Sequence, residues 1–101
     1  MIKHIVFWKL KKEAPDNTAE KNAALIKEKL EALAGKIEGL KEIEVGVNFL
    51  DSPSNYDVAL YTLLESKEAL DFYQNHPLHQ AVLPFVREVV ESRIAVDYEI
   101  D

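Results

Sequence analysis

The sequence predicts an α+β fold of the split βαβ kind, formed by one domain over residues 1–101. Alternating and helical apolar patterns follow one another in the order strand, helix, strand, and then strand, helices, strand. The first and third of these strands are apolar on both faces, which places them at the centre of a sheet. The composition, with 48 % apolar and 30 % charged residues, is that of an ordinary globular protein.

The first half of the chain begins with a strand over residues 2–11, whose two alternating sets of side chains both contain β-forming residues. Asn17 and Glu20 are spaced like a capping box, so a helix is expected to begin near Thr18. Its apolar stripe ends near Gly35, which is a suitable stop. In the second strand, apolar residues alternate with polar ones, as is typical of an edge strand: Ile43, Val45, Val47 and Phe49.

The second half opens with a strand over residues 56–64 that is again apolar on both faces. Ser66 is expected to cap a short helix, which His76 and Pro77 interrupt because proline restricts the residue before it. Helical spacing then resumes, and Pro84 must either kink this helix or lie in its first turn. The last strand, residues 93–100, has one polar side and one apolar side: Ile94, Val96, Tyr98 and Ile100.

Four strands in this order form a four-stranded antiparallel sheet of ferredoxin-like topology, with one face covered by the chain's own helices. The other face would be apolar and bare in a lone subunit. A two-fold symmetric homodimer is the commonest way to cover such a surface, so we expect two sheets to face each other. The expected dimer-interface residues are Ile5, Phe7, Ala59, Tyr61 and Leu63.

The charge balance argues against nucleic acid as a partner, because a net charge of −6 repels phosphate and the lysines alternate with glutamates. The chain has no cysteine, which excludes disulfides, thiolate metal sites and cysteine nucleophiles. There is no apolar run long enough to span a membrane and no apolar core of a signal peptide. We therefore expect a cytoplasmic protein that does not associate with membranes.

Three segments resemble the stress-responsive A/B barrel domain (Dabb) family of the dimeric α+β barrel superfamily. They are the opening strand Ile2–Lys11, the segment Tyr56–Leu60 and, most specifically, the segment Tyr73–His79, in which tyrosine, His-Pro and a second histidine have the family's spacing. The resemblance extends over nearly the whole chain. It implies a homodimer that forms a dimeric α+β barrel, with helices outside and sheets inside.

The resemblance also implies a candidate catalytic site. One enzymatic branch of the family closes plant polyketides into aromatic rings without a cofactor. In that branch, residues matching His79 and Tyr73 transfer protons, and a histidine matching His4 lies at the same pocket. All three are present here, whereas Val58 and Leu30 replace a histidine and a tyrosine of that branch, so a more apolar pocket is expected.

His79 is the expected acid or base, because the ordinary pKa of an imidazole, about 6.5, is close to working pH. It would remove an acidic proton flanked by carbonyls, while Tyr73 would donate a hydrogen bond to the enolate oxygen and His4 would orient the ligand or His79. This chemistry requires no cofactor. No metal site is expected, since Pro77 lies between His76 and His79, and only His4 could supply a third nitrogen. His76 is expected to fix the turn between helices.

The sequence therefore leads to two alternative hypotheses of function. The first is a stress-associated dimer that binds a small apolar ligand between sheet and helices. The second is a cofactor-free polyketide-cyclase-like enzyme, lyase or isomerase acting on a carbonyl ligand; a cofactor-independent monooxygenase is a weaker third. Asp57, Asp97 and Glu99 are expected to be exposed strand residues, not a carboxylate pair. The expected pocket residues are Val6, Trp8, Leu30, Val58, Leu60 and Phe85.

Overall fold

The computed structural model describes residues 1–101 and contains one antiparallel sheet with the strand order β2-β3-β1-β4. Strands β1 (Ile2–Leu10) and β3 (Val58–Leu64) lie at the centre, and β2 (Leu40–Val47) and β4 (Val90–Glu99) form the edges. The predicted ferredoxin-like fold is confirmed, including the central position of the two strands that are apolar on both faces.

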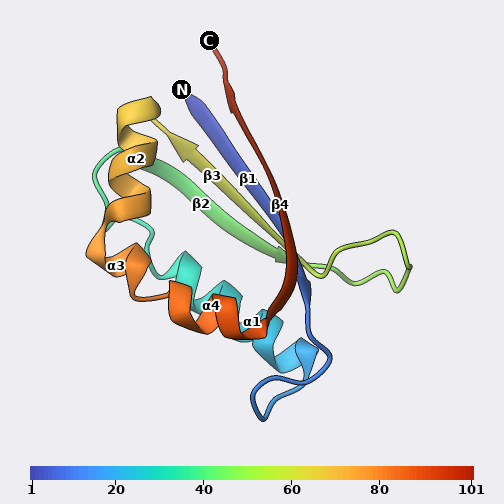
Figure 1. Cartoon of the computed structure of the whole chain (residues 1–101). Coiled ribbons are helices and arrows are strands. Elements are labelled where there is room, and N and C mark those ends of the chain that lie inside the picture. Colours follow the sequence, from blue (N-terminus) through green and yellow to red (C-terminus); the bar gives the residue numbers. More distant parts are fainter.

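The helices α1 (Ala19–Glu31), α2 (Lys67–Asn75), α3 (Pro77–Gln80) and α4 (Leu83–Val89) lie on the same face of the sheet (Figure 1). The buried core fills the space between this helical layer and the sheet. Side chains that are at most 2 % exposed come from both layers, as expected when apolar stripes of helices pack on one face of a sheet; they include Val6, Ile26, Leu30, Leu60 and Val89.

The helix ends agree with the predictions except at the first cap. Thr18, and not Asn17, is the N-cap of α1, because its hydroxyl accepts the backbone N–H of Lys21 at 3.3 Å. The predicted capping box is therefore wrong by one residue. The α-helical part also stops at Glu31, and turns lead from there to Gly35, whose φ of +75° suits glycine.

The second half contains the predicted break. The Ser66 hydroxyl accepts the backbone N–H of Ala69 at 3.0 Å and so caps α2. His76 ends α2 and caps α3, because its Nδ1 accepts the N–H of Leu78 at 3.1 Å. Pro84 lies in the first turn of α4, where its missing N–H breaks no helical hydrogen bond.

Several strand boundaries differ from the predictions: β3 begins at Val58, two residues later than expected, and β1 and β4 each end one residue earlier. β2 ends at Val47, so Phe49 lies in the following loop with 96 % of its side chain exposed. β4 begins at Val90, three residues earlier than expected, since Leu10 of β1 already pairs with it there. None of the helices is long and apolar enough to cross a bilayer.

The helices leave the opposite face of the sheet uncovered, and we call it the outer face (Figure 1). The five predicted interface residues lie there and are half-buried. The pairing of β1 with β4 brings three further apolar side chains beside them, because antiparallel partners share a face. These residues are Ile94, Val96 and Tyr98, with exposed fractions of 51, 57 and 42 %.

Candidate functional site

A cavity of about 370 Å³ lies between the sheet and the helical layer, within the size range of small-molecule sites. Its sheet side is formed by β1, β3 and β4, and its helical side by all four helices. Four of the six predicted pocket residues line it: Val6, Trp8, Leu30 and Leu60. His4 and His79 line it as well, so both predicted histidines reach one cavity from opposite layers.

The orientation of His79 follows from the break between α2 and α3. In a continuous helix the carbonyl of Gln74 would accept the N–H of Leu78, but that N–H is bonded to His76. That carbonyl oxygen instead accepts the side-chain amide of Gln80 at 2.6 Å and lies 3.1 Å from Nδ1 of His79. A carbonyl can only accept, so Nδ1 carries the proton in the neutral ring and Nε2 keeps its lone pair.

The charge state of His79 is set mainly by its burial, which lowers the pKa of the imidazole below its ordinary value. The Gln74 carbonyl opposes this shift because it stabilises the protonated ring, and the nearby His4 adds to the lowering. His79 is therefore predominantly neutral at physiological pH. A neutral imidazole with a free Nε2 is the form that can accept a proton from a ligand.

His4 lies on β1 with 4 % exposure, and its Nδ1 is bonded to the carboxylate of Asp97 on β4. The two residues are direct partners in the β1–β4 register, so their side chains lie on the same face of the sheet. Asp97 is an exposed strand residue, as expected, with 47 % of its side chain exposed, and it has His4 as an additional partner. Because the carboxylate accepts the proton on Nδ1, the ring orientation of His4 is fixed.

The expectation that Asp57 is an exposed strand residue is wrong: it precedes β3 and is half-buried, and its carboxylate accepts the N–H of Leu10 at 2.7 Å.

Tyr73 is completely buried, and its ring lies near both histidines. The ring centroids are 4.5 Å apart for Tyr73 and His79 and 6.4 Å apart for Tyr73 and His4. The hydroxyl has no hydrogen-bond partner within the chain. Burial raises the pKa of Tyr73 far above its ordinary value, so the hydroxyl keeps its proton and can act only as a neutral donor or acceptor.

Two predicted pocket residues do not line the cavity. Val58 is buried at the first position of β3, two residues before Leu60, where it pairs with Trp8 and Val47. Phe85 packs toward α1, and the ammonium group of Lys29 lies 5.3 Å from its ring centroid. The residues that sequence reasoning missed come mostly from the helix ends that meet around the cavity: Gln74, Asn75, Gln80, Leu83, Val86, Arg87 and Arg93.

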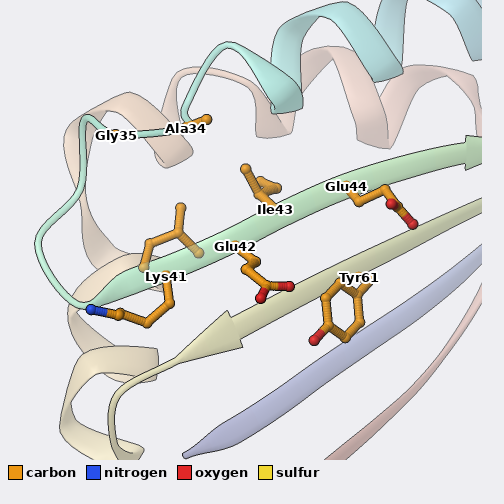
Figure 2. Close-up of a pocket in the computed structure, with 8 residues that line it drawn as sticks. Ala34, Gly35, Lys41, Glu42, Ile43, Glu44 and Tyr61 are labelled. Carbon is orange, nitrogen blue, oxygen red and sulfur yellow. The ribbon is translucent and has the colours of Figure 1, made fainter.

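A second hollow, of about 550 Å³, opens at the β2 edge and differs in chemistry. Figure 2 shows Glu42 and Tyr61 directed to the same side of the sheet, whereas Ile43 points toward the helical layer. This hollow contains carboxylates and no histidine, so it is a poorer candidate for acid–base chemistry. No three His, Asp or Glu side chains gather closely enough anywhere in the chain to hold a metal ion.

The sequence model of a protein family, the Stress responsive A/B Barrel Domain or Dabb, matches residues 2–100. The chain belongs to this family. An uncharacterised protein from Streptomyces coelicolor is 36 % identical over 99 residues, which cover 98 % of this chain and 99 % of that protein.

Solved structures agree with this assignment. A dimeric ferredoxin-like protein of unknown function from Bacteroides fragilis is 36 % identical, with a TM-score of 0.82 over 98 % of this chain and 95 % of that one. A dimeric ferredoxin-like protein of unknown function from Thermobifida fusca is 25 % identical, with a TM-score of 0.83 over 98 and 90 %. These similarities assign the Dabb fold and family, but no particular activity.

Proposed function

We propose that this chain is a single-domain, homodimeric, cytoplasmic Dabb protein of the stress response that binds a small ligand with an apolar body between sheet and helices. The observation that carries the proposal is the cavity of about 370 Å³ with Val6, Trp8 and Leu60 on its sheet side. Two histidines with fixed rings add polar contacts to these apolar walls. Apolar walls with a few oriented polar groups are typical of small-molecule sites.

The homodimer is supported by the outer face. Eight half-buried or exposed apolar residues from the three strands β1, β3 and β4 gather on it, which is an unusual surface to leave in water. The solved relatives of this chain from Bacteroides fragilis and Thermobifida fusca are dimeric. A pair of sheets packed through these faces would form the dimeric α+β barrel.

Ligand binding can be tested by thermal-shift measurements with small aromatic and acyl compounds. A ligand at one hundred times its Kd stabilises the folded state by about 2.7 kcal/mol, which is readily measured. The variant Leu83→Trp should lose the stabilisation, since Leu83 lines the cavity and the larger ring fills it. Leu25→Trp, at a half-buried position of α1 outside the cavity, is the matched control. Absence of stabilisation by every compound would refute the proposal.

A second candidate function is acid–base catalysis on a carbonyl ligand by protein side chains alone, as in a cyclase, lyase or isomerase. It is favoured by one observation: His79 is neutral, donates Nδ1–H to the Gln74 carbonyl and keeps Nε2 as a base at the cavity. The His4–Asp97 pair would assist by hydrogen bonding, whereas Tyr73 is completely buried and does not line the cavity, so it would act through the neighbouring ring of His79.

Deuterium exchange at the acidic carbon of ethyl benzoylacetate, followed by NMR in D₂O, tests this second function without knowledge of the natural substrate. General-base catalysis is typically worth about 10²-fold or more, so His79→Gln should lower the catalysed rate by that factor. His76→Asn is the control, because asparagine can replace the cap of α3. Equal rates for wild type and His79→Gln would rule out His79 as the base.

A further inference from the structure

The charge of the cavity is opposite to that of the chain. The protein has a net charge of −6, with 18 acidic and 12 basic residues. Yet the residues that line the cavity include Arg87 and Arg93, which are the only arginines of the sequence, and no carboxylate. The β2-edge hollow and the two hollows beside α2 all contain glutamates, so this accumulation of cationic groups is specific to the cavity.

Neither arginine is neutralised within the chain. The four ion pairs involve His4 and the lysines Lys27, Lys41 and Lys67. Asp97, four residues beyond Arg93 on the same strand, is already bonded to His4. Both arginine side chains are exposed at the cavity, so their guanidinium groups are available to a ligand. A guanidinium group presents a planar fork of donors that matches a carboxylate.

The arginines and the apolar walls come from different sides of the cavity. Arg87 belongs to the last turn of α4, and Arg93 follows at the start of β4, whereas Val6, Trp8 and Leu60 form the centre of the sheet side. A ligand that fits both regions has an apolar body and a negatively charged end. The chain's overall negative charge favours a monoanion over a dianion.

We propose that the ligand of this cavity is an organic carboxylate with an aromatic or acyl body, whose carboxylate is bound by Arg87 and Arg93. The inference rests on the proposed ligand-binding function and names the chemical class of the ligand. In this pose the apolar body lies along β1, between His4 on the sheet side of the cavity and His79 on its helical side.

Isothermal titration of the full chain with 4-phenylbutanoate and its neutral primary amide isolates the contribution of the charge. The two probes share one apolar body, so a charge-recognising site should bind the acid roughly tenfold more tightly or better. Arg87→Gln and Arg93→Gln should each weaken the binding of the acid roughly tenfold and leave the affinity for the amide unchanged. The advantage of the acid should also shrink as salt is added.

Lys36→Gln is the control variant, because Lys36 is exposed, forms no ion pair and lies outside the cavity. It should change neither affinity. Equal binding of acid and amide to the wild type would overturn the carboxylate proposal while leaving the ligand cavity intact. If neither probe binds, and no compound of the thermal-shift series binds either, the proposed function itself is overturned. Phenyl phosphate, if bound more tightly than the carboxylate, would overturn the assignment to carboxylates.

Discussion

At the scale of single residues, the break at Pro77 determines the chemistry of His79. It leaves the Gln74 carbonyl without a helical partner, and that carbonyl then orients the imidazole. A proline in the sequence thus positions a histidine two residues later, through one displaced hydrogen bond. The residue that caps the break, His76, has the structural role expected of it, because its Nδ1 accepts the Leu78 N–H.

The lowered pKa of His79 predicts a pH dependence of stability. The folded ring titrates below the ordinary value of 6.5, so the unfolded chain binds more protons between that value and the folded pKa. The free energy of unfolding should therefore fall as the pH drops through this window and become level below it. Thermal melts of wild type and His79→Gln from pH 7.5 to 4.5 measure the difference. A steeper acid-induced loss in the variant than in the wild type would contradict the sign.

Tyr73 allows stability and function to be separated. An unsatisfied buried hydroxyl costs about 1–3 kcal/mol, so Tyr73→Phe should be as stable as the wild type or more stable. Tyr73→Ala should lose about 3–5 kcal/mol, because it removes a completely buried ring. Urea denaturation of both variants checks these values. If the hydroxyl serves the ligand, Tyr73→Phe should weaken binding or turnover while the fold remains intact; marked destabilisation of Tyr73→Phe would show that the hydroxyl has a structural partner.

At the scale of elements, Gly39 marks a close approach between the two halves of the chain. It joins the turns after α1 to β2, with a φ of +87°. A Cβ atom at this position would lie 2.7 Å from the Cβ of Ala69 on α2. Glycine is therefore required twice, for the backbone conformation and for the close approach of α2.

Two glycine variants separate these requirements. Gly35→Ala should lower the free energy of unfolding by about 1–2 kcal/mol, which is the cost of the left-handed backbone conformation alone, because no atom lies within 4 Å of the added Cβ. Gly39→Ala should lose a further amount of about 1–3 kcal/mol, since α2 has to move. Chemical denaturation of the two variants measures the difference. Equal losses would mean that α2 shifts without cost.

Local patterns were sufficient to predict most elements. The apolar residues on both faces of β1 and β3 predicted their central place, and Ser66, Pro77 and Pro84 predicted where helices start or break. The misses at Asn17 and Phe49 concern element ends, where a neighbouring residue can take over the same role. Thr18 caps α1 instead of Asn17, and the turn after β2 already includes Phe49.

The contacts within the site could be predicted only in part. The spacing of the Tyr73–His79 segment predicted one histidine of the cavity, but the partner of His4 lies 93 residues away in the chain. The pairing depends on the β1–β4 register, which periodicity alone does not fix. One signal was available for the cationic side of the cavity: the only two arginines of the sequence are six residues apart.

At the scale of the whole molecule, the outer face carries the proposed dimer interface. Its apolar residues include Val96, which is 57 % exposed at the centre of the β4 contribution. Burying this surface against a second copy would remove it from water at roughly 25 cal/mol per Å² of apolar area. A lone subunit would leave it exposed.

Val96→Glu is expected to convert the dimer into a monomer at micromolar concentration, because an unpaired carboxylate would have to be buried in the interface. Leu78→Glu should leave the dimer intact, since Leu78 is similarly exposed at 42 % but belongs to α3 on the helical side. Sedimentation velocity distinguishes the two states. A monomeric wild type, or a dimer that tolerates Val96→Glu, would refute the outer-face interface.

Strand β1 lies between β3 and β4, and its side chains alternate between the face that carries the cavity and the outer face. His4, Val6 and Trp8 face the cavity, whereas Ile5 and Phe7 face outward, so no position from 4 to 8 is a free surface site. In β2, by contrast, several positions are exposed. A saturation mutagenesis scan should therefore show alternating tolerance along β2 and uniform intolerance along β1. Along β1, fitness losses at even-numbered positions would report the packing of the core and the cavity, and those at odd-numbered positions would report subunit pairing.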